Sequence, residues 1–221
     1  MPAPAITPIF ATPFAVVPTG VAPDLNAALA SLFLSRATDA QRDRALTRDS
    51  LCFRSREDLF DWQGEPVGQL RREVLGGICA AVMAINHYSD TEFDALGLQA
   101  RARFTIVRSN GCVPASSARM ASWYAIYCVA APPASSARPD SGALRLYAIR
   151  DPTMFMDAAN QRLREPFSGA HHLWRPVAGQ MAVFPGSILH EVALNRAEAD
   201  LILVSARVRF AHPGDQVTRS W

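Results

Sequence analysis

The second half of the chain is a series of short apolar runs separated by loops, and this pattern most restricts the fold. The runs suit strands, and Gly, Pro, Ser and Ala dominate the loops between them. Several short strands at such spacing are typical of a β-sandwich or β-barrel. The predicted strands are 102–107, 123–129, 143–149, 173–177, 181–184, 188–194 and 201–210.

The first hundred residues instead carry helical signals. Residues 14–17 form a predicted strand between two prolines, and Asp24 is the predicted N-cap of a helix over 25–36. The Gly76-Gly77 pair lies inside a second, longer predicted helix over 66–86, and either weakens it or marks close packing against a sheet. That helix follows from apolar residues at three- and four-residue spacing, namely Val67, Leu70, Val74, Ile78, Val82 and Ile85.

These patterns together predict an α+β fold, a jelly roll with N-terminal helices packed on the sheet. The length of 221 residues suits one domain. Residues 1–100 are the predicted N-terminal strand and helices, integral to the fold, and 101–212 are the jelly-roll core. Residues 213–221 form a polar C-terminal tail.

Composition excludes several functions. The net charge of +2 gives no reason to expect nucleic acid or a membrane surface as partner, and no apolar stretch is long enough to span a bilayer. All 22 basic residues are Arg, so Schiff-base chemistry on Lys is impossible. The four Cys lack the spacing of zinc or thioredoxin-like sites. We expect reduced cysteines and a cytoplasmic protein, free or in a particle assembled there.

The most informative stretch is 177–192, which predicts a strand, a tight turn and a second strand. Gly179 and the Pro185-Gly186 pair punctuate its apolar runs, as turn chemistry requires. His190 lies on the second strand. This order resembles the distal part of the metal site in the 2-oxoglutarate/Fe(II) oxygenases, where a Pro- and Gly-containing turn precedes a metal-binding His.

The resemblance extends from about residue 12 to 210 and concerns the short-oxygenase branch of that superfamily. It rests on the order of several motifs: the Leu25-Asn26 helix start, 55–60 (Ser-Arg-Glu-Asp-Leu-Phe), the long helix, 123–129 (Trp-Tyr-Ala-Ile-Tyr-Cys-Val), 141–144, Asp151-Pro152 and the stretch above. It implies a double-stranded β-helix. It also implies Fe(II) and 2-oxoglutarate as cofactors wherever the site is complete.

The site that the resemblance implies is incomplete in this chain. The family uses a His-x-His or His-x-Asp pair with a distal His. Counting back from 123–129 places that pair at Ser116 and Ala118. A halide can replace the carboxylate in the superfamily, but here both partners of His190 are missing. The expected co-substrate Arg also falls near Asp200, whose charge would repel a carboxylate, and neither Arg207 nor Arg209 matches it.

Other residues offer alternative sites. His171 or His172 could face His190, although locally bonded histidines are the commoner case. His87 with Asp90 reads as the end of the long helix, where the dipole favours His. Cys112 follows an Asn-Gly turn and could be a nucleophile, without a recognisable His partner. The remaining acids, Glu191, Glu198 and Asp200, fit a solvated edge better than a catalytic pair.

Three functions remain open. The favoured hypothesis is an oxygenase-like jelly roll that has lost catalysis, has no cofactor and keeps His190 as a lone metal-site remnant. It would act as a structural or binding module with a protein partner or with copies of itself, for example in a phage-like particle. The second is an active Fe(II) dioxygenase, or another enzyme, rebuilt around His190. The third is a carbohydrate- or peptide-binding domain that uses Trp123 or Trp174 for stacking.

Overall fold

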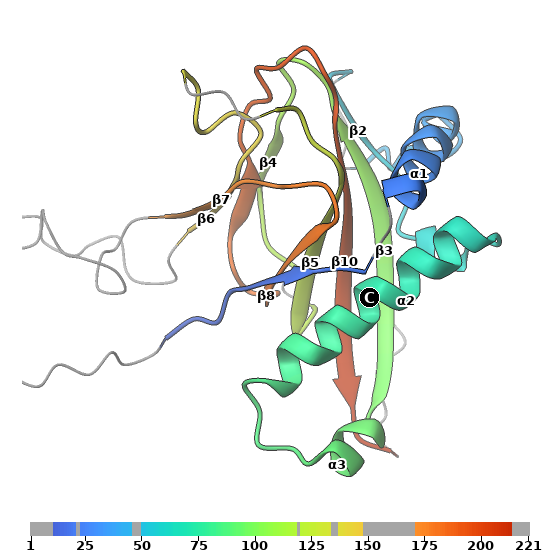
Figure 1. Cartoon of the computed structure of the whole chain (residues 1–221), viewed down its shortest axis with the longest axis vertical. Helices are drawn as coiled ribbons and strands as arrows, with labels where there is room; N and C mark the ends of the chain where they lie inside the picture. Colours follow the sequence, from blue (N-terminus) through green and yellow to red (C-terminus); the bar gives the residue numbers. More distant parts are fainter. Residues whose placement is uncertain are drawn as a thin grey trace, which may run out of the picture.

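Two antiparallel β-sheets face each other in the computed structural model, which describes residues 11–20, 23–45, 50–118, 120–133, 137–147 and 171–213. The larger sheet has the order β1-β8-β5-β10-β3-β2, and the smaller has the order β4-β9-β6-β7. Every pairing between strands is antiparallel. This is the jelly roll with added helices that the sequence predicts (Figure 1).

The larger sheet is built around β10, which pairs with β3 on one side and β5 on the other. Its strands are β1 (Ala15–Pro18), β8 (Gln180–Pro185), β5 (Trp123–Ala130), β10 (Leu201–Ala211), β3 (Gly97–Val107) and β2 (Cys52–Arg54). The smaller sheet contains β4 (Val113–Ser116), β9 (His190–Val192), β6 (Leu144–Leu146) and β7 (His172–Trp174). Strands far apart in sequence therefore meet in both sheets.

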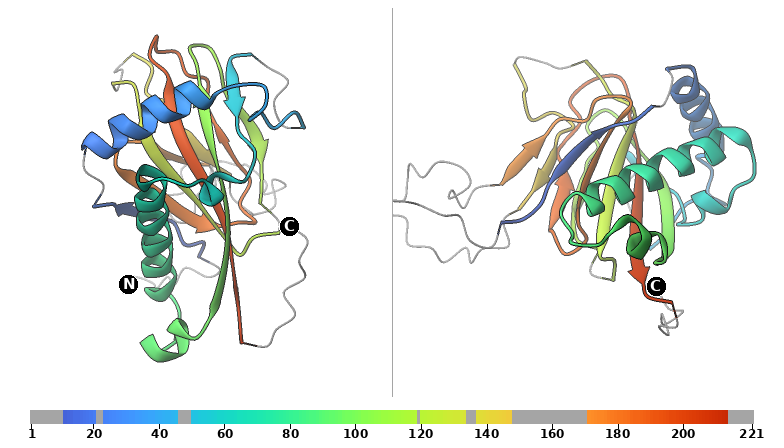
Figure 2. Two further views of the ribbon diagram at one scale, coloured as in Figure 1. Left: turned by 90° about the vertical axis from the view of Figure 1, so that its right-hand side faces the viewer. Right: turned by 60° about the horizontal axis from the view of Figure 1, so that its bottom comes forward.

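The two longer helices cover the outer face of the larger sheet (Figures 1 and 2). They are α1 (Pro23–Arg36) and α2 (Glu65–Met83), accompanied by the short α3 (Asp90–Asp94) and a 3-10 turn over Leu59–Asp61. The buried side of α2 consists of the predicted residues Val67, Leu70, Val74, Ile78 and Val82. Among the described residues, no helix is long and apolar enough to cross a membrane.

Gly77 shows why the glycine pair lies within α2. A Cβ there would stand 2.5 Å from Met181 Cε and 3.3 Å from Val17 Cγ1, so the helix backbone packs directly on the larger sheet. At Gly76 a Cβ would meet nothing within 4 Å. The interpretation of the pair as a mark of close packing is thus confirmed for one of its two members.

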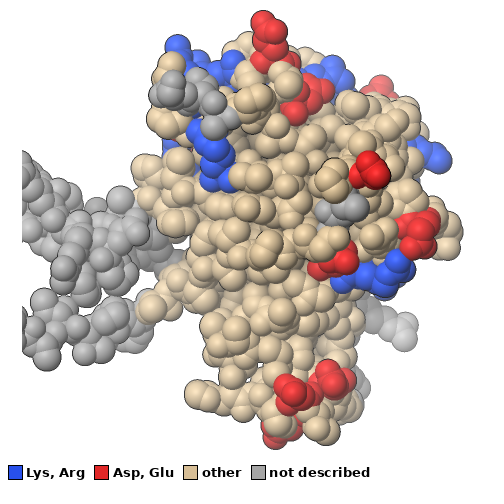
Figure 3. Space-filling model, viewed as in Figure 1, with Lys and Arg blue, Asp and Glu red and all other residues tan. Residues whose placement is uncertain are grey.

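One apolar core lies between the helices and the larger sheet, and a second fills the space between the two sheets. It includes Ile126 and Cys128 from β5, Phe184 from β8, and Leu144 and Trp174 from the smaller sheet. Residues on β10 alternate between the cores: Ile202 packs towards the helices and Leu203 towards the smaller sheet. Figure 3 shows charged side chains gathered towards the rim of the molecule, around a broad uncharged area.

Several boundaries differ from the predictions. Helix α1 begins at Pro23, so Asp24 lies in its first turn instead of capping it. Helix α2 ends at Met83, and His87 lies exposed in the following connection, so the prediction that it ends the helix is wrong. The sequence patterns predict neither β2, which ends in the charged Arg54, nor β4, which contains Pro114. Residues beyond 213, which hold the predicted tail, lie outside the described part.

Candidate functional site between the two sheets

His190 lies on the inner face of the smaller sheet, directly opposite Ser116. Strands β4 and β9 pair with Ser116 in register with His190, and β6 places Leu146 on the other side of His190. Residues that face each other in a ladder share one face of the sheet. The position predicted from the order of motifs is therefore the one that faces His190 across the ladder, and it carries a hydroxyl group.

The His190 ring is enclosed by aromatic side chains, and only 6% of the residue is exposed. Its centroid lies 4.8 Å from that of Tyr124 and 5.1 Å from that of Phe184. The Nδ1–H group donates to the Ile188 carbonyl oxygen at 2.9 Å, because that oxygen can only accept. The lone pair of Nε2 is left to accept a hydrogen bond or bind a ligand.

Burial lowers the pKa of His190, against the opposing effect of the Ile188 hydrogen bond, and the charge of Arg54 lowers this pKa further. The imidazole is therefore neutral at neutral pH. A neutral imidazole can coordinate a metal, so protonation does not stand in the way of metal binding. The donors around it decide whether metal can bind.

Those donors do not fit Fe(II). Ser116 and Ala118 supply a hydroxyl and a methyl group where two ligands are needed. The Ala118 N–H donates to the Gly186 carbonyl at 2.8 Å, which ties this segment to the turn before β9. A search of the described residues finds no group of three His, Cys, Asp or Glu side chains that could hold a metal ion.

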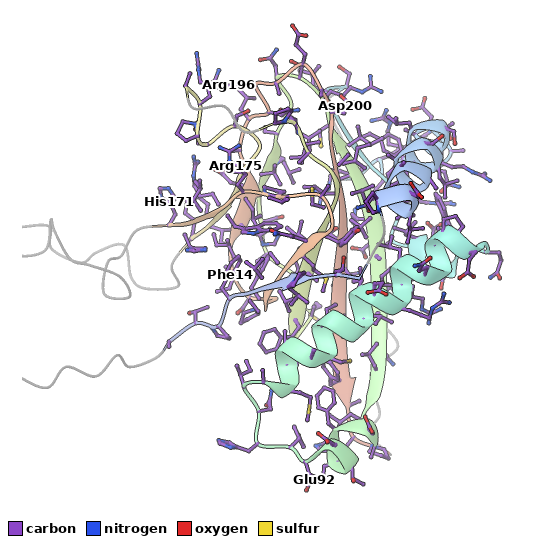
Figure 4. The ribbon with its side chains drawn as sticks, viewed as in Figure 1. Phe14, Glu92, His171, Arg175, Arg196 and Asp200 are labelled. Carbon is purple, nitrogen blue, oxygen red and sulfur yellow. The ribbon has the colours of Figure 1, made fainter. Side chains whose placement is uncertain are left out.

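The neighbouring histidines do not rebuild the site. His172 pairs with Leu146, so it lies on the same face as His190 but two strands away, about 10 Å by the usual strand spacing. It is exposed, and its ring packs on Phe14 with centroids 4.6 Å apart. His171 lies nearest the Tyr147 ring, at the side of the smaller sheet away from the helices (Figure 4).

The expected co-substrate anchor is also replaced. Asp200 directly precedes β10 and lies at the same end of the sheets as Arg196 (Figure 4). The first residues of β10 that face the other sheet are Leu201 and Leu203, which belong to the apolar core. Among the residues that the structure describes, the first positions of this strand carry no guanidinium group.

Arginines instead gather further along the inner face of the larger sheet. Arg207 pairs in register with Tyr124, and Arg103 with Ser205 on the same strand, β10. Arg103 forms ion pairs with Asp43, at 2.9 Å, and with Glu57, and Glu57 also pairs with Arg207. The result is a partly buried network that joins β3 and β10 to the segments flanking β2.

Arg54, the last residue of β2, belongs to this cluster but not to its ion pairs. It pairs in register with Thr105 on β3, and Arg103 lies two residues before Thr105 on the same face of that strand. Its buried Nε has no hydrogen-bond partner among the described residues, and none of the ion pairs found there involves it. Burial lowers the pKa of Arg54, partly opposed by the nearby Tyr124 hydroxyl. Arg103 and Arg207 thus share the carboxylates of Asp43 and Glu57, and Arg54 lies beside this network.

The other candidates find less support. Cys112 is half-buried after Asn110, whose φ of 60° places it in the left-handed region, and no histidine bonds to it within the described chain. Trp174 is buried between the sheets, whereas Trp123 is half-buried and lines a surface pocket of about 190 Å³ with Tyr88, Phe93 and Phe210. Glu191 forms an ion pair with Arg145.

Comparison with known proteins supports the fold alone. No family model and no curated protein sequence matches the chain. Among solved structures, a prolyl-4-hydroxylase from Pseudomonas putida is 18% identical with a TM-score of 0.57, over 90% of this chain and 93% of that one. The chain has the jelly-roll fold of the 2-oxoglutarate oxygenases.

Two further structures show the same likeness. The α-ketoglutarate-dependent carbocyclase SnoK from nogalamycin biosynthesis is 9% identical with a TM-score of 0.61, over 94% of this chain and 85% of that one. HygX from Streptomyces hygroscopicus, with nickel and 2-oxoglutarate bound, is 14% identical with a TM-score of 0.53, over 89% and 82%. The predicted resemblance to this superfamily is confirmed at the level of fold.

Proposed function

We propose that this chain is a non-catalytic binding module built on the oxygenase jelly roll. The observation that carries the proposal is the register of β4 and β9, which sets Ser116 opposite His190. The fold is kept and the distal His is kept, but the partner position offers no imidazole or carboxylate. A single neutral imidazole does not hold Fe(II), so the residues left between the sheets serve binding.

The location of the polar side chains supports binding over a purely structural role. Besides the apolar core between the sheets, Arg103, Arg207 and Tyr124 lie on the inner face of the larger sheet, and the Tyr124 ring packs on His190 of the smaller sheet. Apolar packing alone would not require polar side chains at these positions. Association with a protein partner or with a second copy of the chain is part of the proposal. The exposed apolar side chains Leu34, Ile85 and Leu189 are compatible with it.

The alternative is an active Fe(II) dioxygenase, because the chain shares the fold of HygX and of the prolyl-4-hydroxylase. The two readings differ in one assay. The purified chain is incubated anaerobically with Fe(II), then given 2-oxoglutarate and oxygen, and succinate is measured. We expect no succinate above the level of a His190→Ala control. Succinate that depends on both Fe(II) and His190 would overturn the proposal.

A further inference from the structure

A pocket of about 190 Å³ opens on the helix side of the larger sheet, the face turned away from the smaller sheet and His190. Its lining residues come from the end of α2, from the segment around α3, from the start of β5 and from the end of β10. Pockets that hold drug-sized ligands have volumes of about 300 Å³ or more. This pocket therefore suits a small group.

The pocket forms where β5 is shorter than its neighbours. Trp123, the first residue of β5, pairs with Val208, whereas β10 continues beside β3 as far as Ala211. Phe210 therefore lies diagonally beyond Trp123 on the same face of the sheet, and its partner in the ladder is Leu98 of β3. The space left by β5 is bounded by Trp123 and Phe210, which both line the pocket.

Aromatic side chains supply much of the lining. The Phe93 ring lies 5.4 Å from the Phe210 ring and 6.3 Å from the Tyr88 ring between centroids, and the ring planes are inclined by 46° and 59°. The Tyr88 ring in turn lies 6.2 Å from that of His212. Rings inclined to one another in this way resemble the aromatic enclosures that hold quaternary ammonium groups through their π-faces.

The charges around the pocket favour a cation. None of the residues that line it is Arg, Asp or Glu. Val82 and Asn86 place it at the C-terminal end of α2, where the helix dipole is negative and the last turn carries no basic residue. Helix α3 adds three carboxylates, and Figures 3 and 4 show acidic side chains at this end of the molecule, Glu92 among them.

The guanidinium group next along β10 lies on the other face of the sheet. Arg209 and Phe210 are consecutive residues of this strand, so their side chains point to opposite faces. The Arg209 Nε–H group donates to the Met120 carbonyl oxygen. Its positive charge is thus separated from the pocket by the sheet.

We propose that this pocket binds a small organic cation that carries a quaternary ammonium group and is free in solution. The methyl groups pack on the rings of Tyr88, Phe93, Trp123 and Phe210, and the charge faces the end of α2. A quaternary ammonium has no N–H, so its transfer into an apolar pocket leaves no donor without an acceptor. The inference goes beyond the proposed function, because none of these residues lies between the sheets.

The test is an NMR titration of the full chain at low ionic strength and pH 8. Choline is the probe, and 3,3-dimethylbutan-1-ol, in which carbon replaces the charged nitrogen, is its neutral analogue of the same shape. We expect choline to bind about tenfold more tightly than this alcohol, as a desolvated cation–π contact predicts. Ethanolamine, whose three N–H groups would lose their water, should also bind more weakly than choline.

Matched variants locate the site. Tyr88→Leu should weaken choline binding by about fivefold or more and bring it close to that of the alcohol. Tyr88→Phe is the control, because it keeps the π-face and should bind choline like the wild type. Trp123→Leu should also weaken choline binding, which gives a second variant from a different element. Thermal unfolding confirms that each variant is folded.

Four results would overturn the inference: no binding of choline at millimolar concentration, equal binding of the neutral alcohol, a folded Tyr88→Leu variant that binds choline like the wild type, or a trimethyllysine peptide that binds more tightly than choline. The last result would assign the pocket to a modified protein. The oxygenase assay concerns His190 on the other side of the sheet, so succinate formation would contradict the proposed function and leave this inference intact.

Discussion

At the scale of single residues, the neutrality of His190 has a consequence for stability. An unfolded His takes up a proton near its ordinary pKa of about 6.5, whereas burial and Arg54 keep folded His190 neutral to lower pH. The unfolded chain therefore binds more protons as the pH falls below that value, and stability is lost there. Stability from this source is fully present above the unfolded pKa.

The free energy of unfolding of the wild type should fall between pH 7.5 and pH 5.5. In His190→Gln we expect this fall to be smaller by about 1 kcal/mol. The measurement is the free energy of unfolding in urea at both values of pH. His87→Gln, a substitution at an exposed position, is the control variant. An unchanged pH dependence in His190→Gln would show that folding does not lower the pKa of this ring.

The arginine cluster allows a second comparison between neighbouring residues. Arg103 is buried and paired with two carboxylates, so Arg103→Met should lower the free energy of unfolding by about 3 kcal/mol. Arg54 has no such partner among the described residues. Arg54→Met should therefore leave the free energy of unfolding unchanged or raise it by about 1 kcal/mol. Chemical denaturation of both variants measures the difference. Equal losses would mean that Arg54 has a stabilising partner.

At the scale of elements, the two glycines of α2 make opposite predictions. Gly76→Ala should raise the free energy of unfolding by about 0.5 to 1 kcal/mol, since Ala is the better helix former and the added methyl meets open space. Gly77→Ala should lower it by about 1 kcal/mol or more, because the methyl would displace Met181, which is fully buried, and press on Val17. Thermal unfolding compares the two, and a stabilised Gly77→Ala variant would show that α2 does not pack this closely.

Elements that carry an apolar run or an apolar periodicity could be predicted from the sequence, and β2 could not. The spacing of Val67, Leu70 and Val74 identifies α2, and the apolar run at 201–210 identifies most of β10. Strand β2 has three residues and carries Arg54 on its inner side, so neither its hydropathy nor its alternation stands out. Strand β2 forms because it pairs with the longer β3, and single-sequence patterns do not carry that information.

At the scale of the whole molecule, one part of the site could be predicted from the sequence and the other part could not. Ser116 and His190 could be placed together because the order of motifs resembles a known family, and the ladder confirms the pairing. The cluster of Arg54, Arg103 and Arg207 could not, since three strands bring it together from distant parts of the chain. Arg207 was noticed in the sequence, but only the register beside Tyr124 shows where it lies.

The jelly-roll fold and the register of Ser116 with His190 together predict that a metal site can be built at this position. Ser116→His combined with Ala118→Asp would supply the two missing ligands beside His190. We expect Ni(II), an air-stable substitute for Fe(II), to stabilise this double variant by about 2.7 kcal/mol at a concentration one hundred times the dissociation constant. The melting temperature should rise with Ni(II) in the double variant only, and it should not rise when His190→Ala is added. A His190-dependent rise in the unmodified chain would mean that Ser116 does not prevent metal binding, and the binding-module proposal would then be wrong.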